Sequence, residues 1–419
     1  MTAWAFATFW AFLSIAVGQA VMARRFVRTL RHTPAKPLAD PPCPKTAVIL
    51  CLRGPDPFLP ACIDAVLRQD YPEYDLHIVV DSREDPAWRI AEQAVRKHAA
   101  STVHMKPLTA RLPTCSLKCS SLVQVISDLD GSYEAIALLD ADTLAHRTWL
   151  RELVAPLADD RVAAATGNRW YMPDVASWGS LIRRLWNAAA VVHMHLFQIP
   201  WGGTLALKLS VVRRSDLLER WANALCEDTM LYRVLRQLGY RVAFVPSLMM
   251  VNREHCGIED FFRWVRRQLL TTRLYHPAWG LIVAHGLGIS LILATGLVLL
   301  AAAAIMRNVH AAAWLAAGMA SYWAVMAALL TTLDEGVRRN LQTRGEITTS
   351  MRLRDWPRTF AAMLLTQMVY TAALASALFL RIVDWRGIRY RVDGPAKIRM
   401  LEYKPYVNDA DSPSALQSL

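Results

Sequence analysis

Four long stretches without Asp, Glu, Lys or Arg constrain what this chain can fold into. They span residues 1–22, 280–305, 311–333 and 359–380, and each is long enough to cross a bilayer as a helix of about 20 residues. Only Arg307 to His310 separates the second stretch from the third, which predicts a transmembrane hairpin. Because 20% of the residues are charged although 54% are hydrophobic, we expect one globular domain beside these spans.

The N-terminal stretch is predicted to be an uncleaved anchor, residues 1–23. Four arginines follow it directly: Arg24, Arg25, Arg28 and Arg31. A signal peptide would carry its positive charges before the apolar region, and here the order is reversed. The bias of basic residues toward the cytoplasm therefore predicts that the domain after the anchor is cytoplasmic. We expect an integral, multi-pass membrane protein, in the inner membrane if the source is bacterial.

Several prolines in the basic segment 24–44 predict a stiff linker. They are Pro34, Pro37, Pro41, Pro42 and Pro44. After it, segments 45–255, 256–279, 280–383 and 384–419 are predicted to be a catalytic α/β domain, an interfacial helix, three spans with a basic loop, and a basic tail.

The chain carries a formal charge of +12, which favours nucleic acid or anionic lipid as a partner. It has no nucleic-acid-binding motif, and its basic residues crowd beside the apolar stretches. The lipid bilayer is therefore the expected partner, and nucleic acid is not. Four spans that start outside would put the basic tail outside as well, against the positive-inside bias. The sequence leaves the side of the tail open.

Short apolar runs alternate with helical segments between residues 45 and 255. Runs at 46–52, 76–80, 135–139, 162–166 and 239–246 predict strands. Strands that alternate with helices predict a parallel sheet with right-handed crossovers.

Carboxylates stand where two of these strands end. Asp140 and Asp142 follow the run 135–139 and point the same way along an extended chain. Such a pair suits Mg²⁺ or Mn²⁺ bridged to substrate phosphates; the alternative is a polar turn that caps the next helix. Asp81 ends the strand 76–80 and predicts a nucleotide contact, with a solvated loop as its alternative.

Other charged residues lie where helices are predicted to begin. Lys118 lies among small residues where a helix is expected to start, a position that suits a diphosphate; a surface lysine is the alternative. Glu227 and Asp228 precede an amphipathic helix and predict a general base opposite the diphosphate, or else an acidic pair that complements the helix dipole.

Two amphipathic segments are expected at the membrane surface. Residues 180–195 have an apolar side and lead to Trp201, Gly202 and Gly203; a core helix is the alternative. Residues 260–268 form a basic, aromatic helix before the second apolar stretch, typical of an interfacial anchor that can also hold a diphosphate.

In this order, the motifs resemble membrane-bound family 2-type glycosyltransferases. The set comprises Asp81, the Asp140-Ala-Asp142 motif, the Glu227-Asp228 pair and the basic helix before the spans. The likeness is closest to the ceramide glucosyltransferase branch, family 21-like, and covers nearly the whole chain. The tail, Asp384-Trp-Arg-Gly-Ile-Arg-Tyr-Arg391, is similar to the C-terminal pattern of that branch.

The resemblance implies a GT-A fold and inverting transfer from a nucleotide-sugar. By motif position, Asp81 and Lys118 contact the nucleotide, Asp140 and Asp142 bind the metal–diphosphate, and Asp228 is the general base with Glu227 beside it.

One motif departs from the family pattern, which has (Q/R)xxRW after the acidic pair. The helix has Arg267 where the tryptophan should follow Arg266, and Gln268-x-x-Thr271-Thr272 matches only the first place. Which arginine meets the diphosphate therefore stays open. The residues assigned to the nucleotide-sugar are Arg53, Arg266, Arg267 and Gln268, with Asp81, Lys118 and Asp140. Those assigned to the acceptor are Trp201, Gly202, Gly203 and Trp264.

The expected function is transfer of one sugar from UDP-glucose or a related UDP-hexose to the hydroxyl of a membrane lipid, ceramide-like or other. A processive polysaccharide synthase is one alternative, although three C-terminal spans are few for a channel. An inactive scaffold that binds sugar nucleotides is the other alternative, although both carboxylate motifs are intact.

Overall fold

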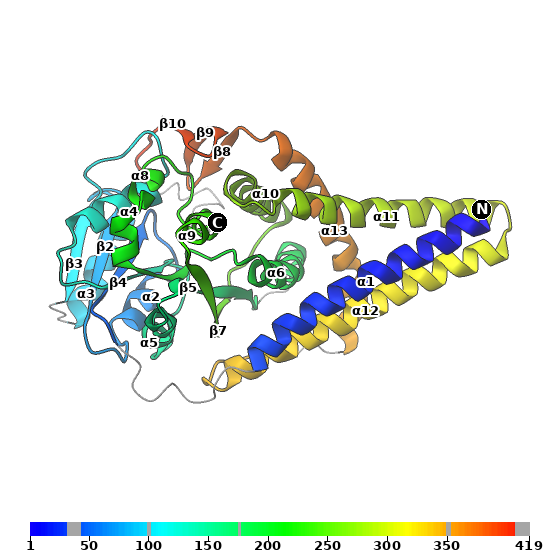
Figure 1. Ribbon diagram of the computed structural model, residues 1–419, viewed down its shortest axis with the longest axis horizontal. Coiled ribbons are helices and arrows are strands. Elements are labelled where there is room, and N and C mark those ends of the chain that lie inside the picture. Colours follow the sequence, from blue (N-terminus) through cyan, green and yellow to red (C-terminus); the bar gives the residue numbers. More distant parts are fainter. Residues whose placement is uncertain (32–42, 99–101, 175–176, 349–352, 407–419) are drawn as a thin grey trace.

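The computed structural model describes residues 1–31, 43–98, 102–174, 177–348 and 353–406. A sheet domain lies at one end of the molecule, and long helices extend from it (Figure 1). The predicted linker prolines from Pro34 to Pro42 lie outside the described residues.

A seven-stranded sheet in the order β3-β2-β1-β4-β6-β5-β7 forms the core of the domain. Its strands are β1 (Thr46–Leu52), β2 (Tyr74–Val80), β3 (Val103–Pro107), β4 (Ala135–Leu139), β5 (Val162–Tyr171), β6 (Thr204–Lys208) and β7 (Arg241–Asn252). All neighbouring pairs are parallel except those of β6, which runs antiparallel to β4 and β5. The predicted parallel sheet is therefore mixed, because it contains an antiparallel strand, β6, that was not recognised from the sequence.

Helices cover both faces of this sheet. They are α2 (Leu59–Val66), α3 (Pro86–His98), α4 (Leu117–Asp128), α5 (Trp149–Val154), α7 (Leu209–Arg214), α8 (Leu217–Trp221) and α9 (Leu231–Gln237), with the short 3-10 turns η1 (Ala155–Ala158) and η2 (Leu353–Asp355) elsewhere. Alternate residues of β1 enter two separate cores: Ala47 and Ile49 pack on one face, and Val48 and Leu50 on the other. A strand covered on both faces must be apolar throughout, which is why β1 and β4 read as unbroken apolar runs.

Six longer helices build the other half of the molecule: α1 (Thr2–Arg31), α6 (Trp178–Phe197), α10 (Ile258–Tyr275), α11 (Trp279–Ile305), α12 (Val309–Gln342) and α13 (Trp356–Phe379). Of these, α1, α11, α12 and α13 are long and apolar enough to cross a membrane. In Figure 1, α1, α11 and α12 extend away from the sheet, whereas α13 runs across their near ends. α13 packs against α6, α10 and α11.

A second sheet follows α13 in the tail, where the sequence had indicated basic residues and a family-like pattern but no strands. It contains β8 (Ile382–Trp385), β9 (Ile388–Gly394) and β10 (Lys397–Glu402) in antiparallel order. Arg386 and Gly387 join β8 to β9 with φ of 50° and 75°. A two-residue hairpin turn whose twist matches that of its strands requires such positive values. The buried side of β9 packs into the same core as α4, so the tail sheet is part of the sheet domain.

Candidate active site

A polar cavity of about 170 Å³ opens at the carboxyl ends of β1 and β4. Among the residues that line it are Arg53, Asp81, Lys118, Asp140, Asp142, Trp201, Gly202, Glu227, Asp228, Trp264, Arg267 and Gln268. All of these were predicted as site residues. Two others, Gly203 and Arg266, do not line the cavity.

Asp140 and Asp142 lie together at the end of β4, and both are close to one positively charged side chain, that of Arg169. The guanidinium of Arg169 lies 3.5 Å from Asp140 Oδ2 and 3.8 Å from Asp142 Oδ2. Asn252 Nδ2 donates to Asp142 Oδ2 at 3.1 Å. Burial raises the pKa of Asp142 to about 6 although Arg169 opposes it, whereas at Asp140 the nearby cations outweigh burial and lower the pKa.

Lys118 connects two of the predicted motifs. Its Nζ lies 2.7 Å from Asp140 Oδ1 and 2.6 Å from Glu227 Oε1. Burial alone would lower the pKa of this ammonium, but the two carboxylates raise it. Glu227 is 2% exposed. Its buried ion pair with Lys118 holds the ammonium group beside Asp140.

Asp228 is held differently from its neighbour Glu227. Its Oδ2 accepts a hydrogen bond from Gly202 N at 2.9 Å, and its Oδ1 accepts one from Thr229 Oγ1 at 2.9 Å. The side chain is half-buried and lines two cavities, the polar one and a second described below. Its carboxylate is thus fixed where the two spaces meet.

Asp81 meets a cluster of donors at the end of β2. It pairs with Arg53, with Arg111 Nε at 3.1 Å, and accepts from Tyr403 Oη at 3.2 Å. Arg53 also donates to the backbone oxygens of Arg386 and Lys404. The predicted nucleotide residue is therefore joined to the tail sheet through Arg53.

The reversed direction of β6 brings the Gly202–Gly203 loop to the site. Because β6 is antiparallel to β4, its first residue, Thr204, pairs with Leu139 at the end of β4. A Cβ on Gly202 would lie 1.9 Å from Glu227 Oε1, and one on Gly203 would lie 2.6 Å from Asp140 Oδ2. A side chain is excluded at Gly202 by the close approach of the Glu227 carboxylate, and at Gly203 chiefly by the Trp201 ring, whose nearest atom would lie 2.1 Å from the Cβ.

One face of α10 forms a wall of the polar cavity. Trp264, Arg267, Gln268 and Thr271 line it, at the spacing of neighbours on a helix surface. The Arg267 guanidinium lies 4.7 Å from the centroid of the Trp385 ring, and burial lowers its pKa to about 10, with Arg386 and Arg169 adding to the effect. Arg266 instead lies 5.5 Å from the centroid of the Phe262 ring.

Sequence reasoning missed several residues of this site. Arg169 and Asn252 come from the far ends of β5 and β7, where no motif marks them. Trp385, Arg386 and Tyr390 come from the tail sheet and line the polar cavity. Arg386 donates to Arg53 O at 2.8 Å and reaches Asp56 at 3.3 Å. Their only signal was the tail pattern, to which no role had been assigned.

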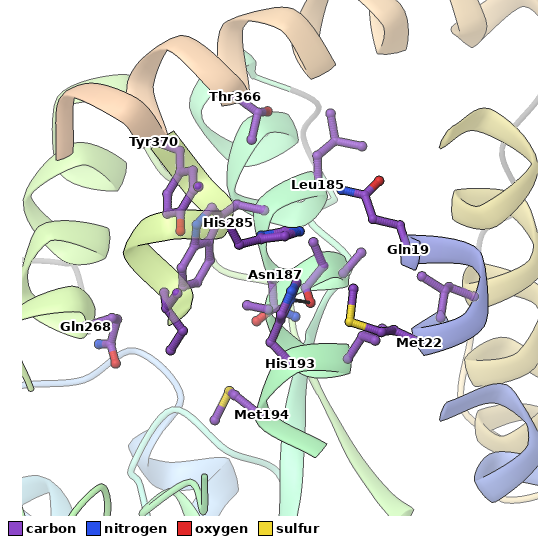
Figure 2. A pocket seen from close by; sticks show the side chains of 18 of the residues that line it. Gln19, Met22, Leu185, Asn187, His193, Met194, Gln268, His285, Thr366 and Tyr370 are labelled. Atoms are coloured by element: carbon purple, nitrogen blue, oxygen red, sulfur yellow. Dashed lines mark hydrogen bonds between the residues drawn. The ribbon is translucent and has the colours of Figure 1, made fainter. Parts of the chain in front are cut away.

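An apolar cavity of about 320 Å³ lies beside the polar one. Residues of α1, α6, α10, α11, α12 and α13 line it, and Figure 2 shows part of this lining. Six residues line both cavities, and so mark where they meet: Arg169, Trp201, Asp228, Trp264, Gln268 and Thr271. The predicted acceptor residues Trp201 and Trp264 thus stand between a charged space and an apolar one.

The carboxylates of the polar cavity fit a divalent cation that is bound together with a substrate. Arg169 occupies the position of a cation that bridges Asp140 and Asp142. Among the described residues, no group of three or more His, Cys, Asp or Glu side chains is arranged to hold a metal ion. Mg²⁺ usually takes one or two carboxylates and completes its shell with water and substrate phosphates, so two carboxylates suffice here.

The family model of glycosyl transferase family 21 matches residues 8–398 of the chain. The chain belongs to this family. This confirms the resemblance that the motifs had indicated. The mixed sheet with its helices is a GT-A glycosyltransferase fold. The four long apolar helices fit a membrane-associated chain.

Solved structures give more distant matches. A mannosyltransferase from Pyrobaculum calidifontis, in complex with GDP-mannose and Mn²⁺, is 18% identical, with a TM-score of 0.48 over 90% of this chain and 99% of that chain. Glucosyl-3-phosphoglycerate synthase from Mycobacterium tuberculosis, in complex with Mn²⁺ and UDP-glucose, is 13% identical, with a TM-score of 0.36 over 54% of this chain and 77% of that chain. The comparison with curated proteins found no match.

Proposed function

We propose that this family 21 glycosyltransferase moves one sugar from a UDP-hexose, such as UDP-glucose, to the hydroxyl of a membrane lipid, with inversion at the anomeric carbon. The observation that carries the proposal is the position of Asp228. Its carboxylate lines both the polar cavity and the apolar cavity. A lipid in the second can therefore meet a sugar in the first without leaving the bilayer.

The charges of the polar cavity suit the nucleotide-sugar. Asp81 and Arg53 would hold the nucleotide, and Lys118, Arg267 and Arg386 would surround the diphosphate. Asp140 and Asp142 would hold Mg²⁺ or Mn²⁺, which supplies charge neutralisation of the departing diphosphate.

Asp228 would act from the side of the acceptor. With Gly202 and Thr229 holding its oxygens, the carboxylate keeps one orientation and can take the proton of the lipid hydroxyl as that oxygen attacks the anomeric carbon. Trp201 and Trp264 line both cavities and would exclude water from the junction. Exclusion of water favours transfer to the lipid over hydrolysis.

A product assay tests the proposal. Purified protein is incubated with Mn²⁺, a panel of labelled nucleotide-sugars and mixed membrane lipids, and the products are identified by mass spectrometry and by the configuration of the new bond. We expect a lipid that carries one sugar of inverted configuration, formed from a UDP-hexose. A long polymer would instead support a processive synthase, and no turnover of any nucleotide-sugar would support an inactive scaffold.

We also propose that α1, α11 and α12 cross the membrane while α13 lies along its catalytic side, which would revise the prediction of three spans between residues 280 and 383. The segment before α13 contacts the sheet domain, since Arg344 pairs with Glu152 at 2.7 Å. The sheet after α13 does too, since Met400 N donates to Pro113 O at 2.7 Å. Both ends of α13 would then face the cytoplasm with the sheet domain.

The last turn of α13 gives further support. Arg273 of α10 donates to the backbone oxygens of Leu378 and Leu380 at 2.7 and 2.6 Å. The carbonyls at the end of a helix lack partners within the helix, and here a guanidinium of the catalytic half satisfies them. This arrangement would also place the basic tail on the cytoplasmic side, as the positive-inside bias requires.

Cysteine labelling in intact cells tests this topology. His310→Cys lies in the exposed first turn of α12, directly after the connection from α11, and Ala396→Cys lies in the exposed turn between β9 and β10. A thiol reagent that cannot cross membranes should label His310→Cys at once and Ala396→Cys only after permeabilisation, with the unsubstituted protein as background. Labelling of both before permeabilisation would place the tail outside and make α13 a full span.

A further inference from the structure

Each carboxylate oxygen of Asp140 and Asp142 already has a partner within the protein. Asp140 Oδ1 lies 2.7 Å from Lys118 Nζ, and Asp140 Oδ2 lies 3.5 Å from Arg169 Nη2. Asp142 Oδ2 lies 3.8 Å from Arg169 Nη1, and Asp142 Oδ1 accepts a hydrogen bond from Thr143 Oγ1 at 3.3 Å. A divalent cation at these oxygens would lie against two positively charged side chains, and like charges at such distances repel strongly.

The distances indicate which of the two positive side chains is displaced. Lys118 is held twice, at 2.7 Å by Asp140 Oδ1 and at 2.6 Å by Glu227 Oε1, so it keeps one close partner when Asp140 binds a cation. Arg169 is held more loosely, because both of its contacts with the carboxylate pair exceed the length of about 2.7–2.9 Å that is usual between charged groups. Arg169 is therefore the side chain that a cation releases.

Arg169 has other contacts that do not involve these carboxylates. Its Nη1 donates to Tyr171 Oη at 2.8 Å, and its Cζ lies 4.7 Å from the centroid of the Trp201 ring. Its closest polar contact is thus with a neutral hydroxyl. A guanidinium that leaves the carboxylates while Tyr171 and Trp201 hold it stays at the wall of the polar cavity, which Arg169 lines.

Tyr171 can serve as a fixed anchor for that movement because it is buried within a polar network. It is 1% exposed, and the guanidinium of Arg183 lies 4.1 Å from the centroid of its ring. Arg183, 0% exposed, donates to Glu254 Oε2 at 2.9 Å. Glu254 N donates in turn to Asn252 Oδ1 at 3.0 Å. The ring is therefore held from β7 and α6, independently of the contacts that Arg169 makes.

We propose that Arg169 is an internal counter-cation of the site. It neutralises Asp140 and Asp142 before the donor binds, opposes a divalent cation that arrives alone, and turns to the diphosphate when the donor binds together with the cation. The diphosphate makes the exchange possible, since it offers oxygens to the cation and negative charge to the released guanidinium. The inference rests on the proposed function, of which it deepens the donor half.

Binding measurements on the full-length protein test this exchange without any turnover. Arg169→Met keeps a side chain of similar length but removes the charge. Mn²⁺ binding without nucleotide is followed by electron paramagnetic resonance, and UDP binding at saturating Mn²⁺ by calorimetry. The variant should bind Mn²⁺ alone roughly tenfold more tightly than the wild type, because one repelling charge is gone. It should bind UDP about 10- to 100-fold more weakly, the worth of a hydrogen bond to a charged group.

The opposite signs of these two shifts distinguish an exchange from damage to the site, which would weaken both ligands. Arg169→Lys is the second variant, and it also serves if the methionine variant does not fold. It keeps the charge but loses the planar fork, so Mn²⁺ alone should bind as in the wild type while UDP binds roughly tenfold more weakly. Arg161→Met is the control, because Arg161 precedes the same strand and its side chain is 80% exposed. It should bind both ligands as the wild type does.

The possible outcomes separate this inference from the proposed function. If the wild type binds Mn²⁺ and UDP but Arg169→Met binds Mn²⁺ alone no more tightly, Arg169 is not a counter-cation and the inference is overturned while the function stands. Unchanged UDP affinity in both Arg169 variants would overturn the transfer of this side chain to the diphosphate. If the wild type binds neither Mn²⁺ nor UDP, separately or together, the donor half of the proposed function fails and the inference fails with it.

Discussion

The two cavities that meet at Asp228 are built in opposite ways. In the polar cavity, charged side chains already compensate one another: Lys118 pairs with Asp140 and Glu227, and Asp81 pairs with Arg53 and Arg111. The apolar cavity is lined mostly by apolar side chains, and three buried polar atoms of its lining have no hydrogen-bond partner in the part of the chain that the structure describes. The first would therefore suit a charged substrate that replaces internal ion pairs, whereas the second would suit a largely apolar one.

The two proposed substrates would therefore gain their binding free energy in different ways. The proposed diphosphate would compete with carboxylates for Lys118 and Arg169. A bound cation that took Asp140 and Asp142 would release Arg169 and leave Lys118 paired with Glu227 alone. The proposed lipid would displace no ion pair and would gain from burial of its chain among α1, α6 and α10–α13. Substitutions in the two cavities should therefore affect separate kinetic constants.

The largest effect is expected at the junction. Asp228→Asn should lower kcat by roughly 10²–10⁴-fold, the usual worth of a general base, with the UDP-sugar Kd nearly unchanged. Steady-state kinetics and calorimetry measure the two quantities. Glu227→Gln is the neighbouring comparison and should be milder, because Glu227 supports Lys118 and does not line the apolar cavity. Loss of UDP-sugar binding in Asp228→Asn would move this residue to the donor side.

Removal of the cation should affect the polar cavity alone. Excess EDTA, or Asp142→Asn, should lower turnover by roughly 10²–10³-fold, because several kcal/mol of charge stabilisation at the diphosphate are lost. Added Mn²⁺ should restore the chelated wild type but not the variant. The exposed Asp130→Asn is the control and should behave as wild type. Full activity in excess EDTA would contradict a metal-assisted reaction.

Arg386 in the tail sheet tests whether that sheet belongs to the donor side. Arg386→Ala should weaken UDP-sugar binding by about 10- to 100-fold, the worth of a hydrogen bond to a charged group, without changing the preference among lipids. Arg391→Ala, exposed on the next strand and paired with Asp393, should bind as wild type does. If both variants bind UDP-sugar equally well, Arg386 only anchors the hairpin.

The smallest effect is expected from filling the apolar cavity. Ala190→Phe adds a ring to its lining and should raise the KM for the lipid by roughly tenfold, about what a small change of pocket volume is worth. The UDP-sugar Kd should not change. Ala316→Phe, exposed on α12 away from the cavity lining, is the matched control. An equal change of both constants would show that the two cavities are not independent.

The sequence predicted those parts of the site that local patterns encode. β1 and β4 were predicted with the bounds that the structure has, because a strand buried on both faces reads as a short apolar run with sharp ends. Asp140 and Asp142 were found from β4 by position alone. Long uncharged stretches likewise marked α1, α11, α12 and α13, because each is long and apolar enough to cross a bilayer.

What the sequence did not encode locally was missed. β6 is five residues long and comes directly after the Gly202–Gly203 loop, so neither its existence nor its direction has a local signature. Arg169 meets Asp140 only because β5 lies two strands from β4 in the sheet. The meeting of His193 and His285 in the apolar cavity depends on how separate helices pack, which no single segment reveals.

The tail sheet also has a consequence for how the enzyme is made. Trp385, Arg386 and Tyr390 leave the ribosome after every motif of the sheet domain and after all the long apolar helices. A growing chain can thus fold the sheet that carries Asp81, Asp140 and Asp228 while one wall of its polar cavity does not yet exist. The site would be closed only once α11, α12 and α13 have been placed and β8–β10 have returned to the domain, which would tie the onset of activity to completed insertion of the long helices.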